Sequence, residues 1–108
     1  MSPTTPKGPY TVRLTGRADS EVPDLLRRAK EAGIGVRVST ALLEIEAALV
    51  ANPIAWGDPR QRVHGARLTT YHRLFDELAV QYAVHDVVPL VWITSIVPVL
   101  KHPLRDPT

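Results

Sequence analysis

Three short segments that are typical of strands follow one another, joined by very short links, in the second half of this 108-residue chain. They span residues 70–75, 78–85 and 90–97, and the middle one alternates apolar with polar residues from Leu78 to Val84. Alternation with a period of two is typical of a half-buried strand. The links contain two and four residues, which is too short for a crossover between parallel strands. The sequence therefore predicts a three-stranded antiparallel meander.

The first half of the chain begins with a strand and continues with a helix. Residues 10–15 alternate apolar with polar side chains, and Gly16 ends this strand. Residues 21–32 then repeat apolar side chains at helical spacing, which indicates an amphipathic helix. Ser20 is expected to cap its N-terminus, and Pro23 falls in the first turn, where a missing N–H costs little.

A second helix is predicted from Ala41 to about Ala51, with Ser39 or Thr40 as its cap. Residues 34–38 are interpreted as a connection before it. Apolar side chains cover most of the circumference of this helix, so it must be covered on most sides. The sheet and the first helix are the simplest cover, but a partner chain or a second copy, and hence a homodimer, stays open. The last strand is apolar almost throughout, which favours a strand that is covered on both faces.

The predicted fold is α+β, with two N-terminal helices packed on a mainly antiparallel sheet in the order β-α-α-β-β-β. Residues 52–68 form a long loop in this interpretation, and loops of that length are often functional. Residues 10–97 make a single domain. The Pro-containing segments 1–9 and 98–108 are expected to be tails.

Composition removes several classes of function. The chain contains no cysteine, which excludes a disulfide scaffold and any thiolate metal site. No spacing typical of a metal site, a dinucleotide site or a P-loop occurs, so we expect no metal and no cofactor. No apolar run approaches the roughly 20 residues that cross a bilayer, and no signal peptide precedes the first strand. A cytoplasmic protein without membrane association is the expectation.

Basic residues gather between positions 60 and 73. This segment contains four arginines, two histidines and no acidic residue; they are Arg60, Arg62, Arg67, Arg73, His64 and His72. A concentration of positive charge is what nucleic-acid phosphates require, because each contact releases condensed counterions. The alternative is a solvated loop whose arginines each pair with an acidic residue such as Asp58 or Asp76.

The same segment contains residue types that cleave RNA without a metal. Cleavage needs a base for the 2′-hydroxyl, donors for the crowded phosphate and an acid for the leaving oxygen. The candidates for base or acid are the four histidines, because histidine titrates near neutral pH; they are His64, His72, His85 and His102. Tyr71 or Tyr82 can donate a proton, and the ring of Tyr71 can also stack on a nucleobase. On a strand Tyr71 and Arg73 share one face and His72 points to the other. His85 precedes Asp86 and is interpreted as part of a turn.

In order and spacing, several segments are similar to those of one family. They are the opening strand YTVRLT, the helix and exit ALLEIEAALVANPIAWGDP, the basic loop RQRVHGARL, the strand with Tyr71-His72-Arg73, and the closing pair LAVQYAVHD and PLVWITSI. Together they resemble the RelE/ParE superfamily of toxins from bacterial type II toxin–antitoxin systems, over about residues 10–97.

The resemblance implies a toxin that a cognate antitoxin neutralises by wrapping it with a helix or a strand. RelE-like members act as endoribonucleases on mRNA in the ribosome, without a metal, whereas ParE-like members inhibit DNA gyrase and cleave nothing. By position, Arg62, Arg67 and Arg73 are then the phosphate-binding candidates. We expect RelE-like action on RNA through the basic segment, with Arg62, Arg67, Tyr71, Arg73 and His64 as the catalytic set and Arg60 as a further contact.

Two departures from the family pattern support other functions. Active members of the family carry lysines among their basic catalytic residues. In this chain Lys7, Lys30 and Lys101 all lie outside the basic segment, and no tyrosine follows the last strand. A binding module without catalysis, either a ParE-like gyrase inhibitor or a degenerate toxin, is the alternative. A small interaction domain without toxicity is a third hypothesis, because fold resemblance alone transfers no activity.

Overall fold

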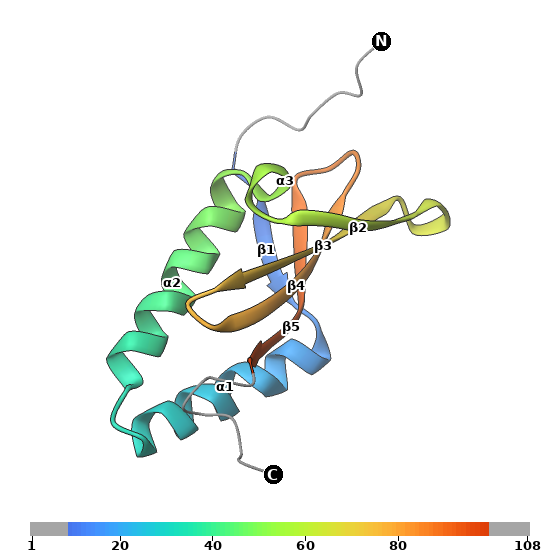
Figure 1. Ribbon diagram of the computed structural model, residues 1–108. Helices are drawn as coiled ribbons and strands as arrows, with labels where there is room; N and C mark the ends of the chain where they lie inside the picture. Colours follow the sequence, from blue (N-terminus) through green and yellow to red (C-terminus); the bar gives the residue numbers. More distant parts are fainter. Residues whose placement is uncertain (1–8, 100–108) are drawn as a thin grey trace.

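A mostly antiparallel five-stranded sheet carries two long helices on one of its faces in the computed structural model, which describes residues 9–99 (Figure 1). The strand order is β1-β5-β4-β3-β2. In chain order the elements are β1 (Thr11–Leu14), α1 (Gly16–Glu31), α2 (Gly35–Ala51), α3 (Pro53–Trp56), β2 (Asp58–Val63), a 3-10 turn η1 (His64–Ala66), β3 (Leu68–Phe75), β4 (Leu78–His85) and β5 (Leu90–Pro98). The predicted tails fall almost entirely on residues 1–8 and 100–108, which lie outside the described residues.

The predicted α+β class and the antiparallel meander are confirmed. In the β3–β4 pair Tyr71 lies opposite Tyr82, and β5 runs antiparallel to β4 with a bulge near Tyr82. The opening strand β1 joins the other side of β5 in parallel, with Thr11 beside Leu90. The C-terminal strand is therefore an interior strand of the sheet. The prediction that both of its faces are covered is not confirmed, because its buried residues largely alternate with half-buried ones and no helix among residues 9–99 lies on the second face.

One hydrophobic core fills the space between the two helices and one face of the sheet. Ala18, Leu25 and Ala29 line the inner face of α1. The inner face of α2 contributes four buried residues, which are Val38, Ala41, Ile45 and Leu49. The strands contribute Tyr71, Leu78, Val80, Tyr82, Val84, Val91, Ile93 and Ile96. Among residues 9–99 no helix covers the opposite face of the sheet, which we call the open face.

The first helix starts earlier than the sequence predicts. It begins at Gly16, and Thr15 rather than Ser20 caps it, with the Thr15 hydroxyl 3.5 Å from the amide nitrogen of Ala18. Ser20 instead donates a hydrogen bond to the carbonyl oxygen of Gly16, at 3.2 Å. Both residues are good capping types, so composition alone did not distinguish them. Pro23 consequently lies inside the helix and not in its first turn.

The second helix also begins earlier, at Gly35, so the predicted connection over residues 34–38 is wrong. Val38 is buried in the core at 1% exposure, and this burial outweighs the weak helix propensity of glycine and valine. The prediction that other parts of the fold cover most sides of this helix is also wrong. Val36 and Leu43 are 83% and 68% exposed among the described residues.

The predicted loop over residues 52–68 is largely ordered structure. It contains the short helix α3, the strand β2 and the turn η1. The side chain of Asn52 caps α3 by accepting a hydrogen bond from the Ala55 amide at 3.3 Å. Every residue of β2 is exposed, because β2 is an edge strand that extends beyond the helices. An edge strand without a buried face shows no apolar alternation, so no periodic pattern predicts it.

Candidate nucleic-acid interface

The β2–β3 hairpin extends away from both helices (Figure 1). It carries three exposed arginines. Arg60 and Arg62 lie on β2, and Arg67 follows the turn η1 in a left-handed conformation with φ 54°. The carbonyl of Arg67 accepts a hydrogen bond from the Asp86 amide at 2.9 Å, which ties the tip of the hairpin to the β4–β5 connection. The guanidinium of Arg67 makes no hydrogen bond or ion pair with another described residue.

Asp86 partly neutralises Arg62. The Asp86 Oδ2 atom lies 3.5 Å from Nη2 of Arg62, at an ion-pair distance without hydrogen-bond geometry. The other oxygen, Oδ1, accepts a hydrogen bond from the Thr69 hydroxyl at 3.0 Å. The Arg62 side chain is still 62% exposed, so the pair is weakened by solvent screening. The expectation of a charge cluster without a local acid is therefore wrong for Arg62, because the acid comes from a different part of the chain.

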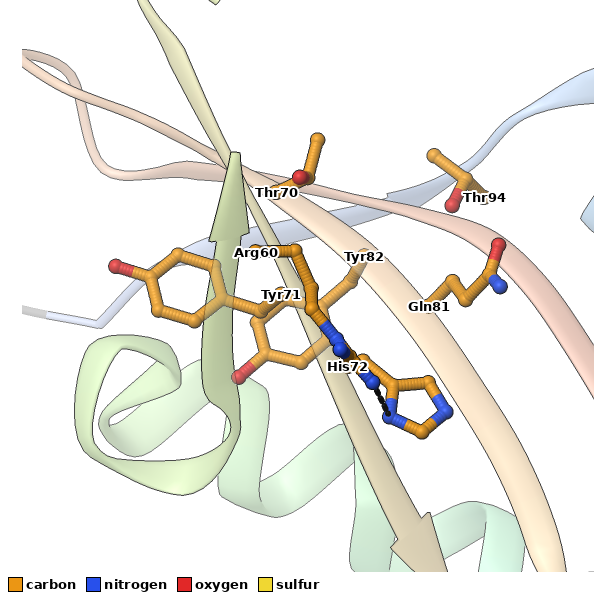
Figure 2. Close-up of a pocket in the computed structure, with 7 residues that line it drawn as sticks. All are labelled: Arg60, Thr70, Tyr71, His72, Gln81, Tyr82 and Thr94. Atoms are coloured by element: carbon orange, nitrogen blue, oxygen red, sulfur yellow. Dashed lines mark hydrogen bonds between the residues drawn. The ribbon is translucent and has the colours of Figure 1, made fainter. Parts of the chain in front are cut away.

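Arg60 points to a different place from Arg62. The register between β2 and β3 shifts between Pro59 and Gln61, and such a bulge re-aims the inserted side chain. The guanidinium of Arg60 reaches the ring of His72, with Nη2 3.3 Å from Nδ1 (Figure 2). When this ring is neutral and Nδ1 accepts the bond, its proton is on Nε2, which leaves that nitrogen as a donor.

A polar cavity of about 390 Å³ opens beside this Arg60–His72 pair. Its lining residues are Arg60, Thr70, Tyr71, His72, Gln81, Tyr82 and Thr94. Figure 2 shows that the side chains of Gln81 and Thr94 lie across from His72, at some distance from the tyrosines. The cavity thus offers a guanidinium, an imidazole, an amide and hydroxyls, which are all groups that hydrogen-bond phosphate or sugar oxygens.

Tyr71 faces away from the polar groups of this cavity. Its hydroxyl points away from His72 (Figure 2), which confirms that neighbouring strand residues point to opposite faces. Tyr71 is 8% exposed, and its ring stacks on that of Tyr82 in the core. Burial raises the pKa of the Tyr71 phenol, and the Asp86 carboxylate raises that pKa further. A raised pKa makes this phenol a weaker acid, so the structure does not favour Tyr71 as a proton donor to RNA.

Arg73 lies on the same face of β3 as Tyr71, as predicted, but it contacts Trp56. Its guanidinium donates a hydrogen bond to the Trp56 carbonyl oxygen and lies over the Trp56 ring, 4.8 Å from the ring centroid. Such a position combines a charge-assisted hydrogen bond with a cation–π contact. Trp56 therefore packs on Arg73 and the sheet. Arg73 lies apart from Arg62, because Arg62 on β2 is opposite Thr69, near the other end of β3.

The predicted catalytic residues do not form one site. Arg62, His64 and Arg67 belong to the distal part of the hairpin, with His64 exposed in η1. Tyr71 and Arg73 lie on the inner face near α3, whereas the open face carries the Arg60–His72 pair. The sequence predicted these residues as one basic segment, in a loop that leads into a strand, and it did not separate the two faces and the tip.

Several residues that line the candidate interface were missed by sequence reasoning. They are Thr70, Gln81 and Thr94 of the polar cavity and Asp58 at the start of β2. Strand alternation was the available signal for two of them, because it places Thr70 and His72 on one face of β3 and Gln81 opposite His72. His85, by contrast, was assigned correctly. Its Nδ1 accepts hydrogen bonds from the amides of Val87 and Val88, both at 3.0 Å, and closes the predicted turn.

The described part of the chain shows neither a cluster of metal ligands nor a helix fit to cross a membrane. Residues 9–99 contain no group of three or more His, Asp or Glu side chains placed to hold a metal ion. Within the same range, none of the helices combines the length and the apolar character that a bilayer crossing demands.

Comparison with known proteins gives no relative for this chain. Neither the family models, nor the curated proteins, nor the solved structures contain a match to it.

Proposed function

We propose that this protein is the toxin-like component of a type II toxin–antitoxin module and that it acts by binding RNA through the β2–β3 hairpin. The proposal rests on one observation, which is that Arg60, Arg62 and Arg67 are exposed on a hairpin that extends beyond the helical layer. The three guanidiniums are distributed along the hairpin, an arrangement that suits successive phosphates of one strand. The α+β architecture is compatible with the RelE/ParE resemblance, and a cognate antitoxin is the implied protein partner.

A binding experiment on the full chain tests the proposal. A labelled single-stranded RNA of about 10 nucleotides, near the site size of small single-strand binding domains, is titrated with protein at several salt concentrations. We expect the triple variant Arg60→Gln, Arg62→Gln and Arg67→Gln to bind at least about tenfold more weakly at low salt.

The matched control removes the same charge from α1. Arg17, Arg27 and Lys30 are exposed on that helix, so their joint replacement by glutamine lowers the net charge by the same amount. The control variant is expected to bind RNA nearly as well as the natural protein. An equal loss of affinity in both triple variants would mean that RNA responds to the net charge of the protein and not to the hairpin. Absence of RNA binding by the natural protein would refute the proposal.

RNA cleavage is a second candidate function, and the Arg60–His72 contact favours it. This pair brings a guanidinium and an imidazole within 3.3 Å of each other beside a polar cavity. The guanidinium can stabilise charge on a phosphate, and the imidazole can exchange a proton with a 2′-hydroxyl or a leaving oxygen. The role predicted for His64 is thus better suited to His72 on geometric grounds.

The two functions are separated by examining the RNA after binding. Cleavage through a 2′-hydroxyl leaves fragments with a cyclic phosphate, and it continues in the presence of a metal chelator. His72→Ala is expected to abolish the cuts while the affinity for RNA falls only slightly. If the RNA stays intact at saturating protein concentration, the protein binds RNA without cleaving it. In cells, arrested growth with intact mRNA would agree with that restricted function.

A further inference from the structure

We infer that a second cavity, at the start of β2, is a subsite for an unpaired guanine base of single-stranded RNA. The inference rests on the proposed RNA-binding function and specifies what the bound strand presents. The cavity has a volume of about 460 Å³, and its lining residues are Trp56, Asp58, Arg60, His72, Arg73 and Leu74. It contains the four kinds of group that a nucleotide needs, namely a stacking surface, an acceptor, a guanidinium and an imidazole.

The cavity exists because β2 is shorter than β3 at this end. β2 begins at Asp58, opposite His72, so β2 leaves the edge of β3 uncovered from Arg73 to Phe75. The short helix α3 precedes β2 and brings Trp56 against this uncovered edge. A flat ligand can therefore approach the edge of the sheet between Trp56 and the start of the hairpin.

The stacking surface is the Arg73 guanidinium lying on Trp56. Phe75 and Tyr82 support the Trp56 ring from the core, each with its ring centroid 5.9 Å away. Arg73 is fixed from the other side by its hydrogen bond to the Trp56 carbonyl oxygen and by its position over the ring. Guanidinium planes and aromatic rings are the surfaces on which unpaired bases stack in RNA-binding proteins. Because both groups are already in place, little side-chain ordering remains for binding.

Asp58 supplies the group that selects the base. Its side chain is exposed and makes no hydrogen bond or ion pair with another residue between 9 and 99, although Arg60 and Arg73 line the same cavity. An ionised carboxylate offers two acceptor oxygens and no donor. Guanine presents two adjacent donors, N1–H and the N2 amine, on its Watson–Crick edge. Uracil presents one donor between two carbonyls, and adenine and cytosine present an amine beside a ring acceptor. The carboxylate therefore complements guanine best.

Arg60 and His72 connect this cavity to the polar cavity on the open face. Both residues line both cavities, so a phosphate bound by Arg60 lies next to the base subsite. A base whose Watson–Crick edge contacts Asp58 is unavailable for pairing, which restricts the ligand to single-stranded or looped RNA. The rest of the strand then continues along the hairpin toward Arg62 and Arg67.

The test compares decamers that differ in one base. An oligouridylate with one central guanosine is compared with the same oligomer containing inosine, which lacks the N2 amine, and with the oligomer of uridine alone. We expect the guanosine decamer to bind at least about fivefold more tightly than the other two, the lower limit for loss of a bidentate base contact. Asp58→Asn is expected to bring the ratio of guanosine to inosine affinity close to one. Asp19→Asn, the same charge change on the exposed face of α1, is expected to leave the ratio unchanged.

The fluorescence of Trp56 gives a second readout, which does not depend on the Asp58 carboxylate. The chain contains two tryptophans, so a Trp92→Phe variant reports on Trp56 alone. The guanosine decamer is expected to quench this emission more strongly than the uridine decamer. Free guanosine monophosphate is expected to compete at least about tenfold more weakly than the decamer, because it lacks the phosphates that Arg62 and Arg67 bind.

The outcomes separate the base subsite from the proposed function. Equal affinities for guanosine and inosine, or a preference that survives Asp58→Asn, would overturn the base subsite while RNA binding by the hairpin stands. Competition by guanosine monophosphate as strong as by the decamer would assign the cavity to free nucleotides and overturn the RNA subsite. If none of the three decamers binds, the proposed function and the subsite both fall.

Discussion

The rings of Tyr71 and Tyr82 stack across the β3–β4 pair, with their centroids 5.2 Å apart and their planes 8° from parallel. Only one of these two hydroxyls is anchored within the described structure. The Tyr82 hydroxyl donates a hydrogen bond of 2.6 Å to the Pro53 carbonyl oxygen, whereas that of Tyr71 has no hydrogen-bond partner among residues 9–99. This stack connects the centre of the sheet to α3, and it thereby positions Trp56 and the start of the β2–β3 hairpin.

Removal of the anchored hydroxyl should destabilise the protein measurably. In Tyr82→Phe the buried Pro53 carbonyl loses its partner, which we expect to lower the free energy of unfolding by about 1–3 kcal/mol. Tyr71→Phe keeps the stack and breaks no hydrogen bond to a described residue, so a change below about 0.5 kcal/mol is expected. Urea unfolding of the two variants measures the difference. Equal effects would show that the Tyr82–Pro53 bond does not anchor α3.

Gly57 is expected to be intolerant of any side chain. A Cβ atom at this position would lie 2.5 Å from Oη of Tyr82 and 3.0 Å from its Cε1 atom, and the Tyr82 ring is fully buried. We expect Gly57→Ala to lower the free energy of unfolding by about 1–3 kcal/mol, the usual effect of overpacking. Gly16→Ala is the control, because nothing lies within 4 Å of its Cβ and it opens a helix. The double variant with Tyr82→Phe should lose less than the sum of the single losses.

Stability should fall at alkaline pH because burial raises the pKa of all three tyrosines, Tyr10, Tyr71 and Tyr82. The neutral phenols are favoured in the folded protein, so their contribution is complete below the unfolded value of 10.0 and is lost as the pH rises through the folded values. Phenolate absorbance of the native protein should therefore appear above pH 10. Urea midpoints should decrease in the same range. A native titration centred at pH 10 would contradict the burial of these phenols.

The sequence predicted those parts of the fold whose side chains have one buried and one exposed face. β4 alternates visibly, and its two-residue connection to β3 dictates antiparallel pairing. The start of α2 was not predictable in this way, since Gly35 and Val36 are poor helix formers and only the burial of Val38 fixes the segment. β2 was missed because all of its residues are exposed. Local pattern thus succeeds where burial is periodic and fails where tertiary contacts decide.

The candidate site was predictable as a stretch of sequence but not as a constellation. Proximity along the chain grouped the arginines into one basic segment, but it predicted a loop where the structure has the strand β2 of a hairpin. It did not reveal that a bulge turns Arg60 toward His72, or that Arg62 meets Asp86 from the β4–β5 connection. The cavity at Trp56 exists because β2 begins opposite His72 and leaves the end of β3, from Arg73 to Phe75, without a neighbouring strand on that side. Such differences in strand length leave no mark in composition or periodicity.

The β3–β4 turn should be stabilised by glycine. Asp76 and Glu77 form this two-residue turn with φ angles of 49° and 62°, a left-handed conformation that costs non-glycine residues about 1–2 kcal/mol. We expect Glu77→Gly to raise the free energy of unfolding by about 0.5–1 kcal/mol. Glu77→Ala is the matched control, because it removes the same charge and the 3.8 Å contact with Arg37 but keeps the strained conformation. If the alanine variant is as stable as the glycine variant, backbone strain is not the cause.

The salt dependence of RNA binding should count the arginines that contact phosphates. For single-stranded RNA the logarithm of the binding constant falls with the logarithm of salt concentration by about 0.7 per phosphate neutralised. Arg67 has no ion-pair partner among the described residues, so Arg67→Gln should reduce this slope by about 0.7. Arg62 is weakly paired with Asp86, so Arg62→Gln should reduce the slope by less. Arg27→Gln should leave the slope unchanged, because Arg27 is paired with Asp24 and Glu31 on α1. An equal reduction in all three variants would mean that the whole surface, and not the hairpin, attracts RNA.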